Sequence, residues 1–210
     1  MREMPRSTLL SSREVSSGCA DGCPAGLVCG NDDLCVPPPP VGSCENPEVF
    51  NPFGSNLGDC PGPICFYSGD TTANVSNTAG SCGEPGSPDH VFSISVDEFI
   101  CPAGGCQICL STAPVYCDGR FLSGPCIGSL SDDGWPNGAL PTTFDTIIRV
   151  HEQSCLGAEV ACEVNTYPGI RGSAVTVDMM PNQNYFVVVD GQSPGLFGQF
   201  NLVVSYGACP

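Results

Sequence analysis

The residue types that could perform hydrolysis meet in a short motif near the C-terminus. Residues 191–195 match the GxSxG pattern of serine hydrolases, in which a strand turns sharply into a helix and lifts the serine hydroxyl toward a histidine. His90 and His151 are the two histidines available as bases. Strand-like segments lie on both sides of Ser193, so we expect a hairpin loop there and no catalytic serine.

Cysteine spacing suggests a second chemistry, structural zinc binding. Four thiolates that include a CxxC pair are standard zinc ligands, and the relevant cysteines here are Cys101, Cys106, Cys109, Cys117 and Cys126. The chain has 16 cysteines in all. A large, even number fits an oxidising compartment, where cysteines pair as disulfides, and not a reducing one. We therefore predict disulfides and no zinc site.

Calcium would need several oxygen ligands that converge on one point. The densest acidic clusters are residues 31–33 (Asn-Asp-Asp) and 132–134 (Asp-Asp-Gly). Neither matches the EF-hand pattern, and short runs of Asp, Asn and Gly are first of all turn formers. We expect no cofactor, with calcium binding as the alternative.

The charge of the chain excludes several classes of partner. It carries 22 acidic residues against 6 basic ones, a net charge of −16. Phosphates of nucleic acids and anionic lipid surfaces repel such a polyanion, so we expect no nucleic-acid partner. The charge either keeps the protein soluble or meets calcium or basic partners. No apolar run approaches about 18 residues, so no membrane insertion is expected.

The chain divides into four segments. Residues 1–17 form a polar leader, expected to be disordered, without the apolar stretch of a secretory signal. Residues 18–36 form a module too small for a hydrophobic core, so disulfides must hold it. Residues 37–43 include four consecutive prolines and form a stiff linker. Residues 44–210 make up the main domain.

Disulfides are expected in both folded segments. Those of the small module join Cys19, Cys23, Cys29 and Cys35, in any of three pairings. The main domain is large enough to bury a core without them, so its cysteines act as additional clamps. The pairs expected there are Cys155 with Cys162 across a short loop, Cys60 with Cys65, and Cys44 with Cys209.

Strand patterns fill the main domain. Apolar and polar residues alternate in several segments, and no window of 11 or more residues shows a helical stripe. Gly and Pro are abundant, at 26 and 21 residues, while 41% of the chain is hydrophobic. These features predict an all-β, antiparallel two-sheet sandwich. The expected strands include residues 92–97, 146–150, 175–177, 185–190 and 200–206.

The order of several short motifs carries a family resemblance. The motifs are GSPDHVF at 86–92, FDTII at 144–148, EVAC at 159–162, YFVVVDG at 185–191 and GQFNLVV at 198–204. Over residues 44–209 the chain resembles the bacterial pre-peptidase C-terminal domain. The resemblance implies a secreted, jelly-roll-like sandwich that is not catalytic and is usually appended to an extracellular peptidase. Relatives include collagen-binding modules, some of which bind calcium.

An insertion interrupts the resemblance at residues 114–141. It contains Asp132, Asp133 and Trp135, the only tryptophan in the chain. A disulfide-clamped loop with an exposed aromatic side chain is a candidate contact surface. The alternative is that Trp135 packs against the sheet.

Together these observations favour a non-enzymatic module, secreted or on the cell surface, that binds extracellular protein or polysaccharide. The alternative is an appendage that aids the export, maturation or stability of a covalently linked peptidase. A small serine hydrolase that uses Ser193 is a third, disfavoured interpretation.

Overall fold

The computed structural model describes residues 19, 22–50, 64–76, 78–98, 101–113, 142–164 and 171–209. The chain forms two compact units that divide between Pro39 and Pro40. Residues 40–43, which we expected in the linker, belong to the second unit. The amide of Gly42 donates to the carbonyl of Asn46, and the amide of Ser43 donates to that of Pro40.

The first unit is a disulfide-bonded hairpin. Strands β1 (Val28–Cys29) and β2 (Cys35–Val36) pair antiparallel. Of the three pairings that the sequence allows, the structure has Cys19–Cys29 and Cys23–Cys35. Most of its residues are exposed, so these two crosslinks take the place of a hydrophobic core.

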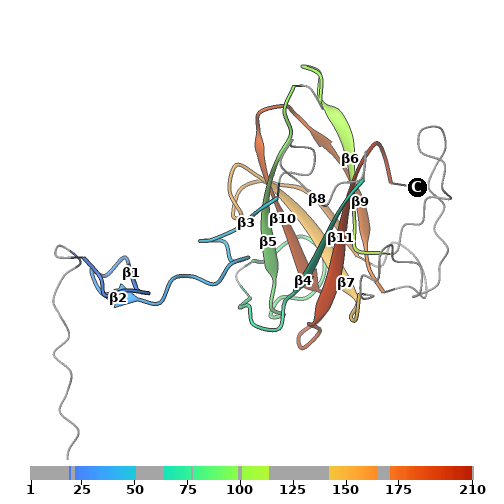
Figure 1. Cartoon of the computed structure of the whole chain (residues 1–210). Helices are drawn as coiled ribbons and strands as arrows, with labels where there is room; N and C mark the ends of the chain where they lie inside the picture. Colours follow the sequence, from blue (N-terminus) through green and yellow to red (C-terminus); the bar gives the residue numbers. More distant parts are fainter. Residues whose placement is uncertain are drawn as a thin grey trace, which may run out of the picture. The chain divides into compact units, whose positions relative to one another are not determined.

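The second unit is a sandwich of two β-sheets (Figure 1), as predicted. The five-stranded sheet has the order β3 (Glu48–Phe50), β5 (His90–Ser95), β10 (Asn184–Gly191), β7 (Thr146–Glu152) and β8 (Glu159–Val164). The four-stranded sheet has the order β4 (Ile64–Asp70), β11 (Gln199–Tyr206), β6 (Cys106–Ser111) and β9 (Ala174–Met179). From β4 onward most successive strands alternate between the two sheets, which is the jelly-roll-like pattern.

The sandwich is antiparallel, as predicted, except at one edge, where β3 runs parallel to β5. One expectation about a strand connection is wrong. The loop that holds Ser193 is not a hairpin, because β10 and β11, which it joins, belong to different sheets. The chain crosses from one sheet to the other there.

The core lies between the sheets and follows the alternation of the sequence. In β5, Phe92 and Ile94 are fully buried in it, while Ser93 and Ser95 are more exposed. Burial of each such large apolar side chain contributes about 1.5–3 kcal/mol. Strand β10 is central and pairs with both β5 and β7. Its Val188 is buried on the opposite face, in a second small cluster with Val91 and Cys155, which explains the continuous apolar run of this strand.

Two disulfides hold chain segments over that opposite face. Cys82–Cys162 ties the connection between β4 and β5 to strand β8, and Cys44–Cys155 ties the start of the unit to the turn after β7. The expected Cys155–Cys162 bridge is therefore wrong. Cys162 lies opposite Arg149 in the β7–β8 ladder, about 10 Å along the strands from the turn that holds Cys155. That separation exceeds the span of a disulfide.

The remaining bridges correct one further expectation, the pairing of Cys44 with Cys209. Cys209 pairs with Cys109, not with Cys44, because β6 and β11 are neighbours in the same sheet. Cys101 pairs with Cys106, so neither of these residues nor Cys109 is available as a zinc thiolate. Cys65 is in a disulfide, while its expected partner Cys60 lies outside the described residues.

In the part of the chain that the structure describes, no helix is long and apolar enough to cross a membrane.

Candidate binding pocket

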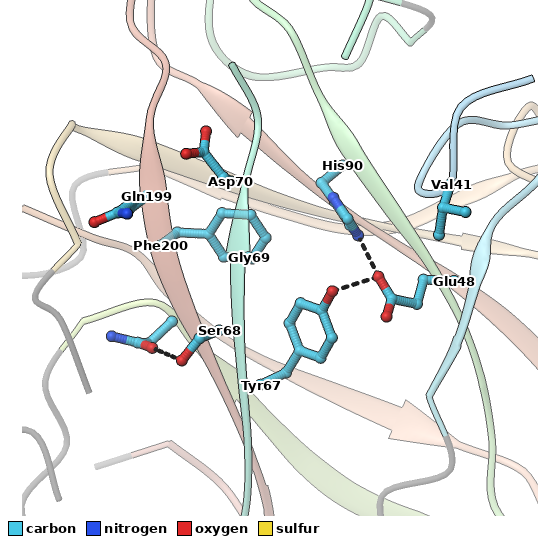
Figure 2. Close-up of a pocket in the computed structure, with 10 residues that line it drawn as sticks. Val41, Glu48, Tyr67, Ser68, Gly69, Asp70, His90, Gln199 and Phe200 are labelled. Atoms are coloured by element: carbon cyan, nitrogen blue, oxygen red, sulfur yellow. Dashed lines mark hydrogen bonds and ion pairs between the residues drawn. The ribbon is translucent and has the colours of Figure 1, made fainter. Parts of the chain in front are cut away.

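A pocket opens between the edges of the two sheets. Strand β3 is an edge of the five-stranded sheet, and β4 is an edge of the four-stranded sheet. The space between them holds a cavity of about 660 Å³ (Figure 2). Its lining comes from the segment that precedes β3, from β3, β4 and β5, and from β11: Val41, Glu48, Tyr67, Ser68, Gly69, Asp70, His90, Gln199, Phe200 and Asn201.

Glu48 links the two sheets across this pocket. Both the Tyr67 hydroxyl and His90 Nε2 bond to its Oε2 atom, the latter at 3.0 Å (Figure 2). The three residues come from β4, β5 and β3. Alternation along β3 sets the direction of Glu48, because Val49 is 81% exposed while Phe50 on the other side enters the core.

His90 is held as a neutral donor. The Asn74 side-chain amide lies 3.2 Å from His90 Nδ1, and an amide nitrogen can only donate, so Nδ1 accepts. The proton is then on Nε2, which donates to Glu48. Burial lowers the pKa of His90, although the Glu48 carboxylate opposes this. The ring packs so closely on Gly42, at φ +83°, that a Cβ there would meet it at 2.5 Å.

Tyr67 is held as a protonated phenol. Partial burial raises its pKa, and the hydrogen bond and charge of Glu48 raise it further. Its ring makes an edge contact with Phe92 at a centroid distance of 4.7 Å. His90 lies 4.6 Å from the same ring. The Tyr67 and His90 side chains, which carry two donors of the pocket, thus both pack against the ring of Phe92.

The rest of the lining, on the other face of β4 and β11 from Tyr67 and Phe200, is made of carboxylate, amide and hydroxyl groups. Asp70 pairs with Gln199 and Ser68 with Asn201 in the β4–β11 ladder. Ser68 Oγ donates to Asn201 Oδ1 at 2.5 Å, so this hydroxyl bonds to an amide and not to His90. Asp70 Oδ1 accepts the backbone N–H of Thr72 at 2.8 Å.

The structure separates the residues that sequence patterns singled out. His90 lies in the pocket, but Ser193 does not line it; the carbonyl of Ser193 accepts a bond from Ser87 Oγ at 2.5 Å. His151 is buried at the end of β7, where Nδ1 lies 3.1 Å from the carbonyl of Gly157. The strand-to-helix context of a nucleophile elbow is missing around Ser193, since β11 follows it.

The proposed contact surface cannot be placed. Trp135, Asp132 and Asp133 lie outside the described residues. The other acidic cluster, residues 31–33, forms an exposed turn of the small unit. Among the described residues, the side chains close enough to share a metal ion all lie in that unit: Cys19, Cys23, Cys29, Cys35 and Asp33. The four cysteine sulfurs are bonded in disulfides, so they are not free to bind a metal.

Sequence patterns did not reveal Glu48 and Tyr67. Neither belongs to a recognisable motif, and β3 is only three residues long, too short for alternation to show. The pairing of β3 with β5 joins segments about 40 residues apart, which no local signal indicates.

A second polar cluster lies beneath the connection between β4 and β5. The guanidinium of Arg149 forms an ion pair with Asp190 at 2.9 Å, with both side chains at most 1% exposed. Arg149 also donates to Thr78 Oγ1, which in turn donates to the buried Asp89 at 2.7 Å. Two carboxylates thus share one cation. Burial raises the pKa of Asp190 to about 6, Asp89 adds to the rise, and Arg149 opposes it.

No known family matches this chain in a profile comparison, and no curated protein sequence matches it.

Proposed function

We propose that this protein is a non-enzymatic extracellular module and that the pocket between β3 and β4 binds its ligand, a protein or a polysaccharide. The cavity carries the proposal. A concave site with aromatic surface and a few fixed polar groups is the usual form of a binding site, and Glu48 fixes its two walls relative to each other.

The hydrogen bonds support binding over catalysis. Hydrolysis by a serine needs a hydroxyl bonded to a histidine. In the pocket, Ser68 donates to Asn201, and both nitrogens of His90 are engaged by Asn74 and Glu48. His90 Nδ1, the nitrogen that could take up a proton, is bonded to the Asn74 amide and to no serine hydroxyl among the described residues.

The disulfides support an extracellular location. Six bridges join described cysteines, and no free cysteine occurs among those that the structure describes. Such crosslinks persist in oxidising compartments. The order of motifs that resembles the pre-peptidase C-terminal domain points to the same setting, and we propose membership of that family on these motifs.

Retention on insoluble matrices tests the function. The oxidised protein would be incubated with collagen, chitin and peptidoglycan, beside the variant Gln199→Trp, which fills the pocket from an exposed position. The matched control is Gln107→Trp, on strand β6 away from the pocket and also exposed. We expect retention on one matrix, lost in Gln199→Trp and kept in Gln107→Trp.

Retention on none of the three matrices would count against a targeting role and favour the alternative, an appendage that supports a covalently linked peptidase. If both variants were still retained, the ligand site would lie outside the pocket.

A further inference from the structure

We propose that the pocket receives a basic side chain, arginine or lysine, of a partner protein. This inference rests on the proposed function and names the chemistry of its ligand.

The first argument is the balance of donors and acceptors. The two strong donors in the pocket, the Tyr67 hydroxyl and the His90 N–H, are both used on Glu48 Oε2. Among the described residues, none donates to Glu48 Oε1, and this side chain is 29% exposed. Asp70 is exposed and accepts one backbone N–H through Oδ1. These two carboxylates therefore favour a ligand that brings donors, and arginine and lysine carry only donors.

The second argument is charge. The pocket is lined by two carboxylates, Glu48 and Asp70, and by no lysine or arginine. Asp70 and Tyr67 point to opposite faces of β4, so Asp70 and Glu48 attract a cation from the two sides of this strand (Figure 2). A phosphate, sulfate or carboxylate ligand would be repelled by both.

The third argument is the field of the whole molecule. A net charge of −16 with no lysine in the sequence draws cationic partners toward the surface and raises their rate of association. A neutral saccharide gains nothing from this field.

The aromatic ring of Tyr67 also favours a basic side chain as the ligand. The half-buried ring of Tyr67 lies beside the carboxylate of Glu48. A guanidinium or ammonium group that reaches Glu48 passes close to this ring, and aromatic faces attract cations. Aliphatic stems of arginine and lysine can pack on Val41, which is 58% exposed at the rim.

The test is a nuclear magnetic resonance titration of the ¹⁵N-labelled, oxidised full chain. The probes are the blocked tripeptides Gly-Arg-Gly and Gly-Glu-Gly and the neutral sugar chitotriose. We expect Gly-Arg-Gly to shift amides of β3, β4 and the start of β11, and its dissociation constant to rise severalfold between 20 and 150 mM salt. Gly-Glu-Gly should produce no shifts there.

Variants that remove one carboxylate test whether the charge of the pocket determines binding of Gly-Arg-Gly. Asp70→Asn should weaken Gly-Arg-Gly binding about twofold, as expected for an exposed, screened charge that points to the other face of β4 from Tyr67. Glu48→Gln should weaken it more. Because Glu48→Gln also disturbs the bonds to Tyr67 and His90, Asp70→Asn at an exposed position is the variant that decides. Asp178→Asn, exposed on β9, is the control and should leave binding unchanged.

The outcomes separate this inference from the proposed function. If chitotriose shifts the pocket amides and Gly-Arg-Gly does not, the pocket binds a ligand but the basic partner is wrong. If no probe shifts these amides and retention on matrices is also absent, both proposals fail. Gly-Arg-Gly binding that Asp70→Asn leaves intact would overturn the charge argument.

Discussion

The cluster of Arg149, Asp190 and Asp89 makes a strong prediction about stability. Arg149 is paired with the buried Asp190 and is linked through Thr78 to a second buried carboxylate, Asp89. Arg149→Met leaves both carboxylates without it, and removal of one partner of a buried ion pair typically costs about 3–5 kcal/mol. Since domains are stable by only about 5–15 kcal/mol, we expect this variant to lose a large part of its free energy of unfolding.

Removal of Asp190 should be much milder. In Asp190→Asn one cation, Arg149, and one carboxylate, Asp89, remain, so the cluster becomes neutral. In the structure, the backbone N–H of Gly191 donates to Asp190 Oδ1 at 2.7 Å. The side-chain amide oxygen of the Asp190→Asn variant can accept the same hydrogen bond. The repulsion between the two carboxylates disappears at the same time. We expect a cost of about 1 kcal/mol at pH 7.5.

The two variants also differ in their dependence on pH. The pKa of Asp190 is raised to about 6 in the fold from its ordinary 3.8, so its proton binds more tightly to the folded state. This contribution to stability is full below pH 3.8 and is lost as the pH rises through 6. Linkage gives about 1.4 kcal/mol more stability at pH 5 than at pH 7.5 from this group, and Asp190→Asn should remove that difference.

Urea unfolding followed by circular dichroism, with the disulfides intact, measures these free energies. The exposed Asp178→Asn serves as control. The reasoning would be refuted if Asp190→Asn destabilised the protein as much as Arg149→Met does, or if wild type and Asp190→Asn responded equally to pH between 5 and 7.5.

Three further predictions follow from the crosslinks and the pocket. Replacement of both Cys82 and Cys162 by Ala should lower the free energy of unfolding by about 2–4 kcal/mol and speed hydrogen exchange in residues 71–89, while an unchanged exchange rate there would show that Arg149 alone holds this segment. A cut after the exposed Arg171 by an arginine-specific protease should leave the fragments joined on a non-reducing gel and separate them after reduction, because Cys109–Cys209 spans that position. Tyr67→Phe should cost about 0.5–1.5 kcal/mol in thermal unfolding, and an unaltered melting temperature would indicate that water replaces the hydroxyl at Glu48.

The sequence was informative where a pattern is local. Alternation in residues 92–97 and 200–206 predicted strands, since period-two burial is visible within a few residues. The same logic failed for pairing between distant segments. The partner of Cys155 is Cys44, 111 residues away, and nothing near Cys155 indicates this.

The candidate site shows the same limit. His90 was noticed as a residue type, but its role depends on Glu48, Tyr67 and Asn74, which come from separate segments. Each is ordinary in its own sequence context. Only the arrangement of both sheets brings their side chains together.

The disulfides of the second unit have a mechanical consequence. A pull applied between Cys44 and Cys209 does not act along the whole intervening chain, because force passes through the crosslinks. The shortest covalent path runs through Cys155 to Cys162, crosses to Cys82, and continues to Cys109, which is bonded to Cys209. That path contains at most about 34 residues and three disulfides, so even a fully unfolded unit extends only about 140 Å, against nearly 600 Å for the uncrosslinked chain. The crosslinks thus fix the maximum extension of the second unit under load.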